Sequence, residues 1–69
     1  QPKHVKLKQE EADKLLEDLN ISTSQLPKIK INDPGLPKES RVGDIVKIER
    51  KDEETGKIFF YYRVVSIWN

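Results

Sequence analysis

Side chains that commonly do chemistry are sparse in this sequence. His4 is the single histidine among 69 residues, and the chain has no cysteine. A histidine acts as a general base beside a nucleophile or an orienting carboxylate, and the neighbours of His4 are lysines. One histidine without cysteine is also too small a ligand set for zinc. We therefore predict no catalytic residue and no metal ligand here, and expect His4 to lie at a surface or an interface.

The run Asp52-Glu53-Glu54 is the other feature that suggests chemistry, because carboxylates bind divalent cations. Calcium loops place their oxygen ligands at alternate positions, whereas these three acids are consecutive. We interpret them as a solvated turn. The sequence also has no glycine-rich phosphate loop and no dinucleotide fingerprint. It therefore predicts no cofactor and no enzymatic turnover by the chain alone.

Aromatic residues gather near the C-terminus, close to Lys57 and Arg63. They are Phe59, Phe60, Tyr61, Tyr62 and Trp68. Aromatic rings beside cations suit the stacking of single-stranded nucleic acid, but a strand covered on both faces needs the same rings for its core, which we favour. Because side chains alternate along a strand, we expect only one face to be exposed, with at most Phe59 and Tyr61 forming a stacking platform.

Length and composition indicate one small domain over residues 1–69. The chain is 35% hydrophobic and 36% charged, which is lean for a free-standing fold without disulfides or metals. The net charge of +1 does not by itself indicate nucleic-acid binding, although residues 9–20 carry −4 and residues 21–51 carry +3. The longest apolar run, Ile58–Tyr62, is far shorter than the roughly 20 residues that span a bilayer. Because the first residue is Gln1 and not Met, we expect residues to have been trimmed before it or to be missing.

Residues Gln9 to Leu19 are predicted to form a helix. Ala12, Leu15, Leu16 and Leu19 follow a 3.6-residue period and form one apolar stripe. Acids occupy the first turns, where they complement the helix dipole, and Asn20 can adopt the left-handed conformation that ends a helix. We expect Leu15, Leu16 and Leu19 to pack on a small sheet, because a helix of about 11 residues is not stable alone.

The remaining pattern predicts short strands separated by turns. Thr23 to Leu26 is expected to form one helical turn, capped by Ser22 and stopped by Pro27. Strands are expected at 28–31, 45–50 and 58–67, with Asp33-Pro34-Gly35 in a turn or at the start of a brief helix. Residues 58–67 are apolar on both faces, so we expect the helix to cover one face and a partner or the chain's own loops to cover the other. The fold class is α+β: a single small domain with a three- or four-stranded mixed sheet, one amphipathic helix and a short helical turn.

Six short motifs occur in order along nearly the whole chain. They are Pro2-Lys3-His4, Gln25-Leu26-Pro27-Lys28-Ile29, Asp33-Pro34, Gly43-Asp44-Ile45-Val46-Lys47-Ile48 with Arg50, Thr55-Gly56, and Tyr62-Arg63-Val64-Val65. This series resembles a family of small subunits of the archaeal DNA-directed RNA polymerase. That family is equivalent to the C-terminal domain of the fifth-largest shared subunit of eukaryotic nuclear polymerases. The resemblance implies a structural and assembly subunit without an active site of its own.

The same resemblance implies particular partners. The family docks on the C-terminal part of the largest catalytic subunit, near the downstream end of the DNA cleft, so DNA is met only indirectly through the complex. Partner binding is expected at family-matching residues outside the helix stripe: Pro27, Asp33, Pro34, Arg50, Tyr62 and Arg63. An archaeal source implies the cytoplasm, and a eukaryotic or viral source implies the nucleus or a viral factory.

Two segments depart from the family pattern. Gly35 to Ser40 is about one residue shorter than is usual and contains Pro37, which disfavours the short helix of the relatives. Thr55-Gly56 stands where Thr-Ala-Gly is more usual. The alternative function is a free-standing small β module that binds nucleic acid, because Gly-Asp-Ile-Val-Lys-Ile also begins strands in small barrels.

Overall fold

A computed structural model describes residues 3–68 of the chain. Its elements are β1 (Lys3–Lys6), α1 (Gln9–Leu19), a 3₁₀ turn (Thr23–Gln25), β2 (Lys28–Lys30), β3 (Ile45–Lys51) and β4 (Ile58–Ser66). The α+β class and the single small domain are confirmed, and so are the bounds of α1. Among the described residues there is no helix of the length and hydropathy needed to cross a membrane.

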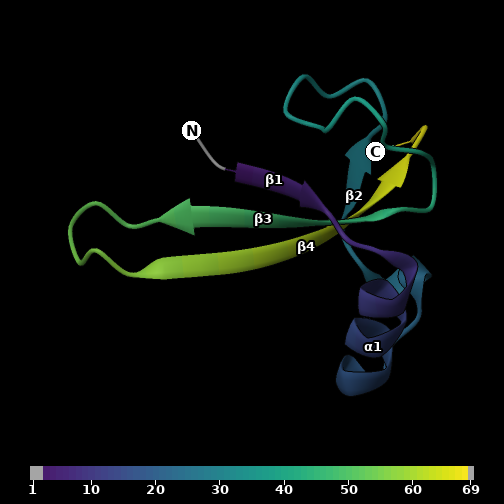
Figure 1. Cartoon of the computed structure of the whole chain (residues 1–69), viewed down its shortest axis with the longest axis horizontal. Coiled ribbons are helices and arrows are strands. Elements are labelled where there is room, and N and C mark those ends of the chain that lie inside the picture. The colour runs from purple at the N-terminus through teal and green to yellow at the C-terminus, as the bar shows by residue number, and fades with distance from the viewer. Residues whose placement is uncertain (1–2, 69) are drawn as a thin grey trace.

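The four strands form one mixed sheet in the order β1-β3-β4-β2 (Figure 1). β3 is antiparallel to both β1 and β4, whereas β2 runs parallel to β4. β3 and β4 form a long hairpin that projects well beyond the rest of the molecule (Figure 1). No strand was predicted at Lys3–Lys6, because one valine among two lysines and a histidine gives almost no apolar alternation; its backbone pairing with β3 decides the structure.

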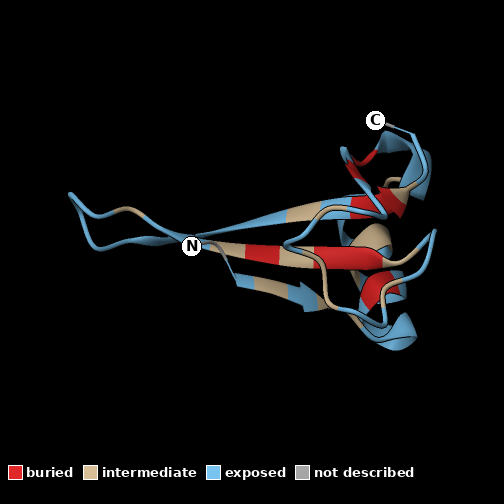
Figure 2. Ribbon diagram, turned by 90° about the horizontal axis from the view of Figure 1, so that it is seen from above, coloured by how far each residue is buried: buried red, intermediate tan, exposed pale blue. Residues whose placement is uncertain are grey.

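Each face of the sheet carries its own small core. The helix-side core consists of Ala12, Leu26, Ile45 and Val64, with Leu15 and Leu16 of α1 packed against it. The loop-side core consists of Ile29, Val46, Ile48 and Val65, with Leu36 packed against it. Buried residues therefore lie at one end of the sheet, and Figure 2 shows the outer half of the hairpin almost entirely exposed.

The helix begins and ends as the sequence suggests, but its apolar stripe is narrower. The Lys8 amide donates to the Glu11 carboxylate at 3.0 Å, which caps the first turn although Lys8 has no capping side chain. Asn20 has a φ of 55° and ends the helix. Leu15 and Leu16 contact the helix-side core as predicted. The prediction for Leu19 is wrong: it is 50% exposed, and Figure 1 shows the C-terminal end of α1 pointing away from the sheet.

The segment between β2 and β3 is a series of turns without a helix. The Asp33 carboxylate accepts from the Gly35 amide at 2.8 Å, and the Asp33 carbonyl accepts from the Leu36 amide at 3.1 Å. Asp33 therefore closes a turn, one of the two predicted alternatives. Pro37 follows at once, and its missing amide accounts for the absence of a further helical turn in this described segment.

Candidate protein-binding surface

A groove of about 730 Å³ lies on the face of the sheet opposite α1. Its floor includes Ile29 and Ile48 of the loop-side core, which explains why the groove is apolar at its base. Tyr61 stands on β4 directly across from Ile48, and His4 lies across from Ile48 on the other side. All four strands thus contribute to one concave surface.

The rim of this groove is mainly positive. Its eleven lining residues include four lysines and arginines, Lys28, Lys30, Arg50 and Arg63, together with His4. Asp33 is the single acid among them, and its carboxylate already accepts the Gly35 amide. We call this surface the cationic groove. Its charge suits a partner that offers carboxylates or other anionic groups.

Arg63 is the most informative member of the cationic groove. Its guanidinium donates to the Lys28 carbonyl at 3.4 Å, so it reaches across from β4 to the start of β2 while remaining exposed. One long hydrogen bond leaves most of its five donors available to a ligand. Among residues 3–68, neither Arg63 nor Arg50 forms a salt bridge, since the pair found there is Lys6 with Asp44 at 3.5 Å.

The structure brings four of the six predicted partner-binding residues together. Asp33, Pro34, Arg50 and Arg63 all line the cationic groove. Tyr62 lies on the opposite face and packs against the helix-side core. Pro27 is exposed at the start of β2, where its carbonyl accepts the Val64 amide at 2.9 Å. A binding role for any of the six remains a prediction.

The family motifs did not assign the other groove residues to partner binding. His4 is the clearest case: the sequence predicted only that it would lie at a surface or an interface. It enters the groove through the unpredicted pairing of β1 with β3. Its ring packs closely on the β2–β3 loop: a Cβ added to Gly35 would lie 3.0 Å from the His4 Cε1 atom. A side chain at position 35 would therefore push the loop away from β1. The Pro-Lys-His and Asp-Pro-Gly motifs were visible in the sequence, but not their contact.

The outer half of the hairpin, residues 50–61, is exposed on both faces; we call it the distal hairpin. Phe59 and Tyr61 lie on the groove side, and Phe60 lies on the helix side with the Lys47 ammonium 5.0 Å from its ring centroid. The residues Phe59, Tyr61 and Phe60 are 44%, 48% and 51% exposed, respectively. The prediction that only one face of this strand is exposed is therefore wrong, because α1 and the β2–β3 loop cover only its C-terminal half.

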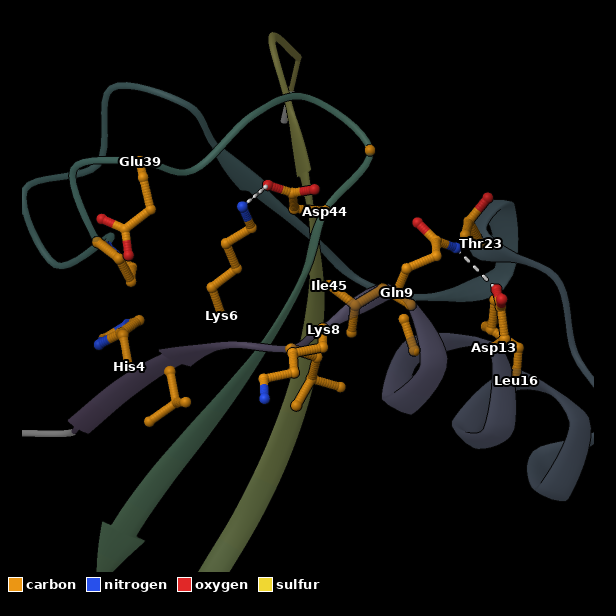
Figure 3. A pocket seen from close by; sticks show the side chains of 15 residues that line it. His4, Lys6, Lys8, Gln9, Asp13, Leu16, Thr23, Glu39, Asp44 and Ile45 are labelled. Atoms are coloured by element: carbon orange, nitrogen blue, oxygen red, sulfur yellow. Dashed lines mark hydrogen bonds and ion pairs between the residues drawn. The ribbon is translucent and has the colours of Figure 1, made fainter.

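A second hollow, of about 800 Å³, separates β1 from the start of α1 and the loop before β3 (Figure 3). Two pairs of its polar side chains contact each other. Lys6 pairs with Asp44, which also accepts the Arg41 amide at 2.8 Å, and Gln9 donates to Asp13 at 2.8 Å. Within residues 3–68 no cluster of three or more histidines and acids could hold a metal ion. The Lys6–Asp44 ion pair at this hollow links β1 to the segment that leads into β3.

These features define a small domain that presents a cationic groove beside an exposed aromatic strand end. A sequence model of the family described as "RNA polymerase Rpb5, C-terminal domain" matches residues 1–65. The chain belongs to this family, as its motifs had indicated.

Archaeal relatives are similar to nearly the whole length of this chain. The protein named "DNA-directed RNA polymerase subunit Rpo5" from Methanosphaera stadtmanae is 51% identical over 65 residues, which cover 93% of this chain and 83% of the relative. The protein of the same name from Archaeoglobus fulgidus is 52% identical over 66 residues, covering 93% and 86%. That from Halobacterium salinarum is 39% identical over 65 residues, covering 94% and 87%.

Proposed function

We propose that this chain is a non-catalytic structural and assembly subunit of a DNA-dependent RNA polymerase and supports transcription by docking on the largest catalytic subunit. Membership in the polymerase family carries the proposal, because the match spans residues 1–65 and the relatives bear a polymerase subunit's name. On this proposal residues 1–69 act as one domain, and the archaeal relatives favour the cytoplasm as its location.

The cationic groove supports docking as the way in which the chain acts. It offers arginines and lysines around an apolar floor, with a single acid that is already occupied. Arg63 and Arg50 come from neighbouring strands of the sheet, so the backbone positions from which their side chains extend are fixed before a partner arrives. We propose that carboxylates of the C-terminal part of the largest subunit fill this groove.

Arg63→Ala tests the groove directly. If Arg63 bridges to a carboxylate of the large subunit, the variant should weaken assembly by about 2–5 kcal/mol, because a desolvated carboxylate would lose its partner. The chain would be mixed with the other polymerase subunits of its source organism, and its incorporation measured by native mass spectrometry. Thermal unfolding of the variant alone would show whether the domain stays folded.

Arg41→Ala is the matched control, since it removes one exposed positive charge outside the groove. It should assemble like the unaltered chain. Normal assembly of a folded Arg63→Ala chain would exclude Arg63 from the interface, and unfolding of that variant would make Arg63 an internal support.

A different measurement distinguishes the polymerase subunit from the alternative, a free-standing module that binds nucleic acid. Titration with single-stranded DNA or RNA at two salt concentrations would reveal a phosphate-binding surface through a steep fall in affinity with salt. Tight, salt-dependent binding by a chain that fails to join the polymerase would overturn the proposal.

A further inference from the structure

β4 is paired unevenly along its two edges. β3 pairs with it from Ile58 to Val64, whereas β2 pairs with it only from Val64 to Ser66. Within the described chain, the β2-side edge of residues 58–63 therefore has no neighbouring strand. Figure 1 shows this half of β4 running along the outside of the hairpin, far from β2.

Two neighbouring residues show to which side of β4 each backbone group points. The Val65 amide donates toward β3, to the Asp44 carbonyl at 2.8 Å, and the Val64 amide donates toward β2, to the Pro27 carbonyl at 2.9 Å. Backbone groups alternate sides along a strand. The amides and carbonyls of Phe60 and Tyr62 therefore point to the open edge.

Pro27 explains why the chain's own strand stops there. In the parallel ladder the Ile31 amide donates to the Ser66 carbonyl at 2.8 Å, and each step of two residues brings the next amide opposite the next carbonyl. Two steps back, the partner of the Tyr62 carbonyl would be the amide of residue 27. Proline has no amide hydrogen, so β2 cannot extend further and the edge stays open.

Apart from Arg63 at its inner end, this edge carries none of the usual protection of an exposed strand. Edge strands commonly carry lysines, prolines or bulges that prevent pairing with another chain. Here the residues along the edge are Phe59, Phe60 and Tyr61, all at least 44% exposed. Such an edge fits a partner strand that pairs with the backbone and covers the rings.

The charges beside the edge indicate the chemistry of that strand. Arg63 reaches over the start of β2, and Arg50 lies opposite Phe59 on β3. Both cations face the groove side of the edge, and within residues 3–68 neither has a carboxylate partner. We propose that an extended segment of another polymerase subunit, with apolar residues and an acidic side chain facing Arg63, adds as a strand to β4 at Ile58–Tyr62.

The inference rests on the proposed polymerase role and adds the mode of binding, so its test must separate the two. The full chain can be made by chemical synthesis with the Phe60 amide N-methylated, which removes the edge-facing donor and keeps every side chain. We expect this chain to fold and to join the polymerase subunits of its source organism with about tenfold lower affinity, because a backbone pair is lost and a methyl group blocks approach. N-methylation of Lys38, whose amide makes no hydrogen bond within residues 3–68, is the control and should assemble normally.

Amide hydrogen exchange provides a second measurement that does not depend on synthesis. In the chain alone the Phe60 and Tyr62 amides should exchange fast and the Tyr61 amide, which points to β3, slowly. In the assembled polymerase all three should be slow. Normal incorporation of the Phe60-methylated chain, or unchanged exchange at Phe60 and Tyr62, would overturn the inference while leaving the polymerase role intact.

Two other outcomes would also count against the inference. Protection of these amides in the chain alone, with a dimer in sedimentation, would assign the edge to a second copy of the chain. Failure of the unmodified chain to join any polymerase subunit would overturn the proposed function and this inference together.

Discussion

The two halves of β4 both carry apolar residues on their two faces, but their surroundings are opposite. The C-terminal half, around Val64 and Val65, is covered by α1 on one face and by the β2–β3 loop on the other. The distal hairpin carries Ile58, Phe59 and Phe60, which neither α1 nor the β2–β3 loop covers and which are 52%, 44% and 51% exposed. A strand that is apolar on both faces thus stabilises the fold at one end and remains available at the other, which suggests that the uncovered end serves a partner.

The largest expected contrast uses two isoleucines that begin neighbouring strands on the helix-side face. Ile45 is 2% exposed in the helix-side core, and Ile58 is 52% exposed in the distal hairpin. Ile45→Ala should lower the free energy of unfolding by about 2–5 kcal/mol through lost burial and a cavity. Ile58→Ala should lower it by less than about 1 kcal/mol. Urea unfolding of both variants, followed by circular dichroism, measures the difference.

Similar losses at the two isoleucines would show that the distal hairpin is packed in the isolated chain. A second copy of the chain would then be the first candidate to cover the distal hairpin, and sedimentation would reveal the dimer.

A smaller contrast compares two leucines of α1, the helix that covers the helix-side core. Leu16 packs against the helix-side core, whereas Leu19 is 50% exposed one turn later. Leu16→Ala should cost about 2 kcal/mol, at the low end for a leucine because the side chain is only half-buried. Leu19→Ala should cost less than about 0.5 kcal/mol, as is usual on a surface. Equal losses of stability in thermal unfolding would mean that Leu19 also packs against the core, as the apolar stripe predicted.

The sequence predicted the elements whose stability is local or strongly periodic. The α1 bounds follow from its apolar period and from Asn20, and the β3–β4 hairpin follows from two apolar runs around a polar turn with Gly56, whose φ is 74°. β1 could not be predicted, because Val5 is its single apolar residue and is itself 37% exposed. Its strand conformation depends on backbone pairing with a segment about 40 residues away.

Only some residues of the candidate site could be predicted from the sequence, and their arrangement could not. Family motifs indicated Asp33, Pro34, Arg50 and Arg63, which all line the cationic groove. Nothing local shows that β2 pairs parallel to β4, and this pairing brings Lys28 next to Arg63. Tyr62 was grouped with them through its motif, yet alternation along β4 places it on the opposite face.

The smallest expected effect concerns the cation–π contact at the distal hairpin. The Lys47 ammonium lies 5.0 Å from the Phe60 ring centroid, and both side chains are partly open to solvent. An exposed contact of this kind contributes about 0.5–1 kcal/mol, so Lys47→Gln should lower the free energy of unfolding by about 0.5 kcal/mol. Lys51→Gln is the matched control, because Lys51 lies on the same strand and face opposite Ile58 and makes no ring contact within residues 3–68. Paired urea titrations of the two variants would resolve the difference, and equal effects would mean that Phe60 gains nothing from Lys47. A ring held by so weak a contact moves aside at little cost, as a partner strand at the edge of β4 would require.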